Sequence, residues 1–280
     1  MRFVSYFCCE LSIEALKRYQ HKRNQGSIQK EKWRGNQVTR FTIRYVASDG
    51  EKYQVEKDDY YSEIDLSDSS IKSISLEPLG QCSSLEKLNL DTNLLTEIDL
   101  SPLSNCPNLK MLSITSNELT DVELEPLSKC YALQALELSD NMLFEIDLEP
   151  LRKCKSLRWL YIADNRLREI DLSPFENNTK LQYLVLSGNL LRDIDLSPIA
   201  KATDLRYLHL NENALEKIDI SVLFNFENLE SLVLDQKTVL TANHKLKHMH
   251  YFPDPINERL NEIEWFHKTV EPGIERDRTT

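Results

Sequence analysis

The sequence predicts an α/β solenoid, a curved array of short repeats with a parallel β-sheet on its concave side and helical turns and extended segments on its convex side. One observation is that leucines recur every 24 residues without a gap, at Leu85, Leu109, Leu133, Leu157, Leu181, Leu205 and Leu229. Another is that most repeats end in a variant of Ile-Asp-Leu-Ser-Pro-Leu. A single unit of this kind cannot bury its apolar face, whereas stacked copies share one continuous core.

The first half of each repeat has the form LxxLxLxxNxL, as at Leu85, Leu88, Leu90, Asn93 and Leu95. The alternating leucines predict a short strand that points them inward and turns the third, fifth and seventh residues outward. An asparagine follows where the chain leaves the strand, and its amide is expected to satisfy backbone groups of the turn. This column contains Asn93, Asn117, Asn141, Asn165, Asn189 and Asn213.

The second half of each repeat alternates apolar residues with acids and then reaches a Ser-Pro pair. The alternation predicts a short extended segment on the convex side. The serine is expected to act as N-cap of a helical turn that begins at the proline, and Ser173 with Glu176 fits a capping box. Two acidic columns result, one of them at Asp99, Glu123, Asp147, Asp171, Asp195 and Asp219. They suit a solvated face better than a calcium site, since no turn typical of calcium loops accompanies them.

This pattern resembles the leucine-rich-repeat family at each diagnostic position. Seven full repeats span residues 61–228 and a truncated eighth follows, so the resemblance covers about two thirds of the chain. The resemblance implies a rigid frame that binds another protein, and it implies neither catalytic residues nor a cofactor. Because fold alone does not fix function, the binding surface has to be sought in the residues that vary between repeats.

Three regions follow from the repeat boundaries. Residues 1–58 are expected to form an N-terminal helix plus hairpin cap, 59–238 the repeats, and 239–280 a C-terminal capping helix and tail. The hairpin is indicated by alternating polarity over residues 41–46 and by the turn at Asp49-Gly50. Such covers are needed because an open solenoid end exposes its core.

The C-terminal helix is predicted to start at Asp254-Pro255, because Ile256, Leu260, Ile263 and Phe266 then follow at helical spacing. We expect it to cover the last repeat. The alternative is a free amphipathic helix that docks on a partner.

Four of the six cysteines share one column, at Cys82, Cys106, Cys130 and Cys154. Their 24-residue spacing does not match the paired cysteines of zinc sites, so buried free thiols are expected. Together with the lack of a secretory signal and of any apolar run of about 18 residues, this favours a cytoplasmic protein without a transmembrane segment.

The concave columns indicate where a partner binds. They place aromatic and basic side chains on three adjacent strands, which predicts a partner-binding patch formed by Trp159, Tyr161, Tyr183, Tyr207, His209, Arg158 and Arg206. The alternative is that these aromatic residues merely stabilise one another across the strands.

A second hypothesis concerns the basic segment 17–44, which contains nine Lys and Arg residues but only one acid, Glu31. Such a segment can bind nucleic acid or an anionic membrane surface, or it can lie on the acidic solenoid of the same chain. His244, His248 and His250 lack a completing carboxylate, so no metal is expected there.

Overall fold

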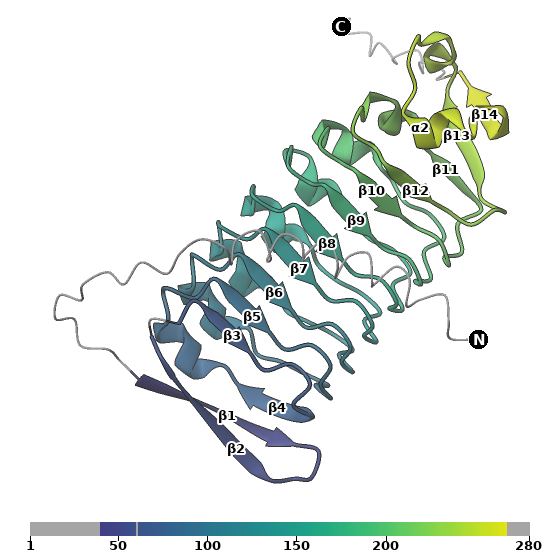
Figure 1. Cartoon of the computed structure of the whole chain (residues 1–280). Coiled ribbons are helices and arrows are strands. Elements are labelled where there is room, and N and C mark those ends of the chain that lie inside the picture. Colours follow the sequence, from purple (N-terminus) through teal and green to yellow (C-terminus); the bar gives the residue numbers. More distant parts are fainter. Residues whose placement is uncertain (1–39, 60, 268–280) are drawn as a thin grey trace, which may run out of the picture.

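The computed structural model describes residues 40–59 and 61–267, which form an elongated solenoid (Figure 1). Its main sheet is parallel, open and eight-stranded, and each strand pairs with the strand 24 residues further on, as at Leu160↔Leu184. The strands are β3 (Glu63–Asp65), β5 (Lys87–Asn89), β6 (Met111–Ser113), β7 (Ala135–Glu137), β8 (Trp159–Tyr161), β9 (Tyr183–Val185), β10 (Tyr207–His209) and β12 (Ser231–Val233). The predicted leucine-rich-repeat solenoid is confirmed.

One hydrophobic core runs the length of the solenoid, from Phe41 in the first element to Ile263 in the last. The central leucine of each strand from β5 to β10 is fully buried, as the alternation predicts. Cys82, Cys106, Cys130 and Cys154 are also buried and are not paired with one another, so the predicted column of free thiols is confirmed.

The asparagine column forms a ladder between repeats. Asn141 Oδ1 accepts a hydrogen bond from Leu119 N, and its Nδ2 donates to Ile114 O in the preceding repeat and to Leu138 O in its own. The other asparagines of the column repeat this pattern, which supports the predicted structural role. Each amide therefore fastens one repeat to the one before it.

Short 3-10 helices return the chain from the convex side, which confirms the predicted helical turns. They are η1 (Glu77–Gln81), η2 (Ser101–Asn105), η3 (Glu125–Lys129), η4 (Glu149–Lys153), η5 (Ser173–Phe175), η6 (Ser197–Lys201) and η7 (Ser221–Asn225). In the second half of the repeats, the described residues form strands only toward the two ends of the solenoid, in β4 (Ile71–Ser75), in β11 (Lys217–Asp219) and in the strand that pairs with β11, β13 (Val239–Asn243).

The predicted serine caps are wrong. Ser173 lies inside its helix, the residue at the N-cap position is Leu172, and no side chain caps that position. Asp171 instead accepts hydrogen bonds from both the backbone N–H and the hydroxyl of Ser173. A carboxylate two residues upstream can reach the first free N–H of the turn, so the acidic column organises the turn as well as being solvated.

A β-hairpin covers the N-terminal end. Strands β1 (Arg40–Ala47) and β2 (Lys52–Asp58) pair in antiparallel fashion, and β1 also pairs with β4 of the first repeat. Gly50 in the connecting turn has a φ of +83°, a conformation that favours glycine. The predicted hairpin is confirmed, whereas the predicted N-terminal helix and most of the basic segment lie outside the described residues.

The C-terminal end departs from the predicted helix. Helix α2 (Asp254–Asn257) is a single turn, and after η9 (Leu260–Glu262) the chain becomes strand β14 (Ile263–Phe266). This strand pairs with β13 (Val239–Asn243), which itself pairs with β11, while η8 (His244–His248) lies between β13 and α2 in the sequence. The open edge of β13 offers backbone hydrogen bonds that a longer helix would leave unmade. Within the described ranges, no helix has the length and apolarity needed to cross a bilayer.

Candidate functional site

Three adjacent strands hold the predicted aromatic patch. The parallel register sets Trp159 on β8 beside Tyr183 on β9, and Tyr183 beside Tyr207 on β10. Two residues further along the same strands, Tyr161 lies beside Val185 and Val185 beside His209. The patch is therefore a direct product of the repeat spacing and lies on the side of the sheet opposite to the buried leucines.

The rings of this patch contact one another in sequence. Tyr183 and Tyr207 stack with ring centroids 4.5 Å apart and an angle of 8° between the ring planes. Trp159 and Tyr161 lie 6.4 and 6.2 Å from Tyr183, and His209 meets Tyr207 edge-on at 6.1 Å. Such contacts restrict the conformations of large side chains, which would lower the entropy cost of a contact made there.

Both predicted arginines border the patch. The guanidinium of Arg158 lies over the Trp159 ring at 6.0 Å from its centroid. Arg206 pairs with Glu230 at 2.9 Å, and the hydroxyl of Tyr207 donates a 2.6 Å hydrogen bond to the same carboxylate. This hydrogen bond raises the pKa of Tyr207 to about 12, so the phenol stays protonated as a donor at neutral pH.

The patch is less exposed than its sequence suggests. Tyr161 and His209 are buried, and Tyr161 forms a second small hydrophobic cluster with Ala163 and Val185, against which Trp159 and Tyr183 pack. Burial lowers the pKa of His209, and its Nε2 lies 3.0 Å from the hydroxyl of Ser231. Trp159, Tyr183 and Tyr207 are half-buried and form the outer layer of the patch.

Carboxyl groups lie on the concave face next to the patch. Glu137 on β7 is the register partner of Tyr161 on β8. Ser113 Oγ donates a 2.6 Å hydrogen bond to Asp91 and lies 3.3 Å from Glu137. Burial raises the pKa of Glu137 to about 8, and the negative charge of Asp91 adds to this effect.

Sequence reasoning did not single out Glu230, Glu137 or Asp91 as site residues. Glu230 lies 24 residues after Arg206, so the same column arithmetic would have placed it beside that arginine. The unusual state of Glu137 had no such signal, because it arises from burial and from the neighbouring charge of Asp91.

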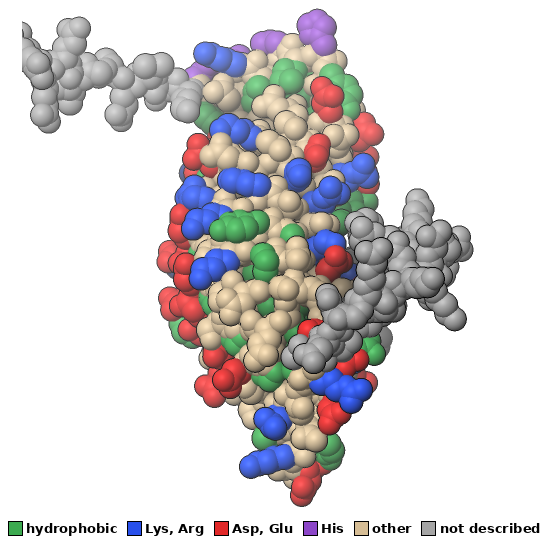
Figure 2. Space-filling model, turned by 90° about the vertical axis from the view of Figure 1, so that its left-hand side faces the viewer, with side chains coloured by type: hydrophobic (Ala, Val, Ile, Leu, Met, Phe, Trp, Pro, Cys, Tyr) green, Lys and Arg blue, Asp and Glu red, His purple; other side chains and the backbone are tan. Residues whose placement is uncertain are grey.

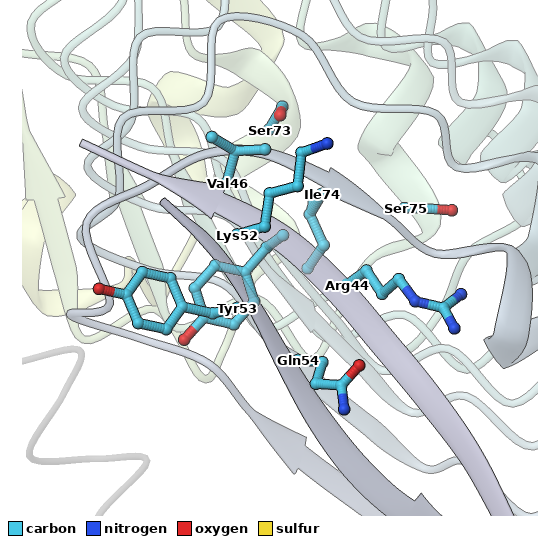
Figure 3. Close-up of a pocket in the computed structure, with 9 residues that line it drawn as sticks. Arg44, Val46, Lys52, Tyr53, Gln54, Ser73, Ile74 and Ser75 are labelled. Atoms are coloured by element: carbon cyan, nitrogen blue, oxygen red, sulfur yellow. The ribbon is translucent and has the colours of Figure 1, made fainter. Parts of the chain in front are cut away.

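Most of the basic segment that the second hypothesis concerns lies outside the described residues. Of the basic segment 17–44, only residues 40–44 are described, and Phe41 belongs to the buried core. Figure 3 shows an open depression beside them on the hairpin sheet. It is lined by Arg44, Tyr45, Val46, Lys52, Tyr53, Gln54, Ser73, Ile74 and Ser75. Its two cations and stacked tyrosines offer a small, shallow surface.

From the sequence, no metal is expected at the histidines near the C-terminus, and the structure places two of these rings together. His244 lies 5.8 Å from His248 and stacks on His267 at 4.3 Å, whereas no ring contact joins either to His250 within the described residues. Among the residues that the structure describes, no three His, Cys, Asp or Glu side chains are arranged to hold a metal.

Charge is sorted by position on the solenoid. Figure 2 shows acidic side chains gathered along the left-hand edge of one face, with Lys and Arg side chains beside them toward its middle. Surface charges of both signs favour solubility of a solenoid of this kind. The side chains of the concave columns are not needed for this and can vary.

Comparisons with known proteins agree with this architecture. A family model described as leucine rich repeat matches residues 62–119, 83–143, 107–167 and 155–201, which together span half of the chain. No curated protein matches the sequence.

Several solved structures are similar to this chain. A leucine-rich-repeat protein of Leptospira interrogans is 22% identical with a TM-score of 0.60, over 73% of this chain and 54% of that one. An internalin (inlF) from Listeria monocytogenes is 24% identical with a TM-score of 0.49, over 70% and 51%. The plant peptide hormone receptor RGFR1 in complex with RGF2 is 22% identical with a TM-score of 0.52, over 60% and 27%. The chain thus spans about half the length of the first two proteins.

Proposed function

This chain belongs to the leucine-rich-repeat family, and from that premise we propose that it is a protein-binding adaptor or recognition scaffold rather than an enzyme. Its partner docks on the concave face over β8, β9 and β10. The observation that carries this proposal is the set of interlocked rings of Trp159, Tyr183 and Tyr207, bordered by Arg158 and Arg206.

The physical support lies in what such side chains supply to an interface. Trp, Tyr and Arg are the residues whose truncation most often weakens protein binding, since they combine large apolar area with polar tips. Here the stacked Tyr183 and Tyr207 rings and the Glu230 contacts fix their positions in advance. A preformed patch on a rigid sheet binds with little further ordering.

We also propose a reducing compartment, the cytoplasm, as the place of action. The buried free thiols of Cys82, Cys106, Cys130 and Cys154 support this, because unpaired cysteines are typical of proteins in reducing compartments. Burial raises the pKa of Cys130 to about 12, which keeps the thiol protonated and inert.

Co-purification from the native source followed by affinity measurements tests the docking surface. Tyr207→Ala and Trp159→Ala should each lower the affinity for the recovered partner by roughly thirtyfold. This corresponds to a loss of about 2 kcal/mol of binding free energy, which is typical of a residue at the centre of an interface. The control is Glu63→Ala on β3, at the far end of the sheet, whose carboxylate is already paired with Lys87. It should change the affinity less than twofold.

A salt titration of the same complex separates the two hypotheses. Contacts made by buried aromatic rings should persist between about 50 and 200 mM salt, whereas binding of phosphates by the basic segment 17–44 should weaken by orders of magnitude. A partner that binds both alanine variants as tightly as wild type would exclude the concave patch as its docking surface.

A further inference from the structure

The floor of the concave face contains two carboxyl groups, those of Asp91 and Glu137, that no basic side chain among the described residues neutralises. Asp91, Ser113 and Glu137 come from three successive repeats. No ion pair within the described part of the chain engages either carboxyl group. One oxygen of Glu137, Oε1, is buried and has no hydrogen-bond partner.

The hydroxyl of Ser113 cannot satisfy both acids. It has one proton, and the 2.6 Å contact shows that this proton goes to Asp91, whose Oδ1 also accepts from Thr115 N. The 3.3 Å contact to Glu137 is therefore a hydrogen bond only when Glu137 itself carries a proton. In the unbound chain Glu137 is thus a buried carboxyl group whose ionisation a nearby cation would favour.

The surroundings suit an organic cation with an apolar stem. The neighbours of Ala135 in the adjacent strands are Met111 and Trp159, so a buried methyl group stands between two long side chains. Glu137 is in register with Tyr161, so an ammonium or guanidinium group on Glu137 would lie beside an aromatic ring. A metal ion would need further ligands, and the described residues hold no group of three that could supply them.

We infer that the partner inserts a lysine or arginine side chain between Met111 and Trp159, so that its cation pairs with the carboxylates of Glu137 and Asp91. This inference rests on the proposed function and specifies the chemistry of the partner. The cation pairs with both carboxylates and offsets one of their two negative charges, and its methylene stem packs between the side chains of Met111 and Trp159. Recognition then combines an apolar contact over β9 and β10 with one charged anchor on β7.

Peptide selection on the full chain tests this inference. A phage-displayed library of random peptides of about twelve residues is selected on the wild-type protein, and binders that need the patch are identified by their loss on Tyr207→Ala. These peptides should contain a Lys or Arg. Replacing it by norleucine, which keeps the stem and removes the charge, should weaken binding at least tenfold.

A double-mutant cycle assigns that basic residue to its acid. On Glu137→Gln, an isosteric change whose fold is checked by its melting curve, the norleucine substitution should cost less than twofold. On Glu63→Gln, the matched control, it should still cost at least tenfold. Carbon-13 NMR of the glutamate carboxyl groups should show the pKa of Glu137 falling by more than one unit when the peptide binds.

The outcomes separate the two levels of the proposal. Peptides that need Tyr207 but contain no essential basic residue, or whose basic residue is equally important on Glu137→Gln, overturn this inference and leave the proposed function intact. If the selected peptides bind the Tyr207→Ala variant as tightly as the wild type, the proposed function is contradicted. If no peptide is enriched on the wild-type protein, both are overturned.

Discussion

The two faces of the main sheet differ although the same strands form them. On the inward face, Leu88, Leu112, Leu136, Leu160, Leu184 and Leu208 repeat one residue type, and each is fully buried. On the concave face, the column one residue earlier contains Lys87, Met111, Ala135, Trp159, Tyr183 and Tyr207. The fold therefore requires the repeated positions, and the variable positions are free to define a binding surface.

The variable face nevertheless has some order of its own. Rings gather toward β8, β9 and β10, while the carboxyl groups of Asp91 and Glu137 lie toward the N-terminal strands. Tyr161 and Val185 are as buried as many core residues. Substitutions on the two faces should therefore differ most in the strands that hold both a core leucine and an aromatic ring.

The largest difference is expected on β8 and β10. Leu160→Ala should lower the free energy of unfolding by about 2 to 5 kcal/mol, because it removes a fully buried side chain and leaves a cavity. Tyr207→Ala should cost less than about 1 kcal/mol, since that ring is half-buried and lies outside the main core. Urea denaturation followed by circular dichroism measures both, and equal losses would show that the two faces are not distinct.

The next largest effect is expected in the asparagine ladder. Asn141→Leu removes the partner of Leu119 N and of Ile114 O in the interior, which should cost roughly 1 to 3 kcal/mol. The matched control is Asn177→Leu, which replaces an exposed asparagine whose side chain, within the described part of the chain, accepts a hydrogen bond only from Lys201. Urea denaturation should show a loss below about 0.5 kcal/mol for the control.

Glu137 makes the concave face sensitive to pH. Its pKa in the folded chain, about 8, lies above the ordinary value of 4.5, so the folded state binds the proton more tightly. The resulting stability is present below about pH 4.5 and is lost as the pH rises through about 8. We expect rotation of the ionised carboxylate toward solvent to relieve part of this cost, so that the effect is smaller than the full pKa shift implies.

Glu137→Gln removes that dependence. The variant should match the wild type near pH 5 and exceed its unfolding free energy by on the order of 2 kcal/mol at pH 9. Glu86→Gln serves as control, because Glu86 pairs with Lys110. A wild-type stability that rises between pH 5 and pH 9 relative to Glu137→Gln would contradict the assigned shift.

The difference between repeated and variable positions also explains which features the sequence could predict. The 24-residue spacing placed the leucines, the asparagine ladder, the buried cysteines and the neighbouring positions of Trp159, Tyr183 and Tyr207, because the register of a solenoid follows from its repeat. The helix expected through Phe266 became strand β14 because the free edge of β13, a tertiary feature, outweighed the local spacing. The raised pKa of Glu137 depends on burial by distant residues, which no local pattern reports.

The sequence pattern assigned the cap of the convex turn to Ser173, whereas in the structure Asp171 has this role. Substitutions at this turn should have the smallest effect on stability. Ser173 has the residue type of an N-cap, yet the carboxylate of Asp171 accepts from its N–H at 2.8 Å and from its hydroxyl at 2.7 Å. These hydrogen bonds lower the pKa of Asp171. Asp171→Ala should therefore destabilise the chain by about 0.5 to 1 kcal/mol, the range of a lost cap in an exposed turn.

Ser173→Ala is the matched control for this assignment. It keeps the backbone N–H that Asp171 accepts and removes only the hydroxyl, so its cost should be less than half that of Asp171→Ala. Urea denaturation at pH 7 compares the two variants with wild type. If Ser173→Ala were the more damaging change, the serine and not the acid would organise the turn. Since an acid fills this position in six successive repeats, from Asp99 to Asp219, and accepts the same backbone hydrogen bond in each, the result would apply to those six turns.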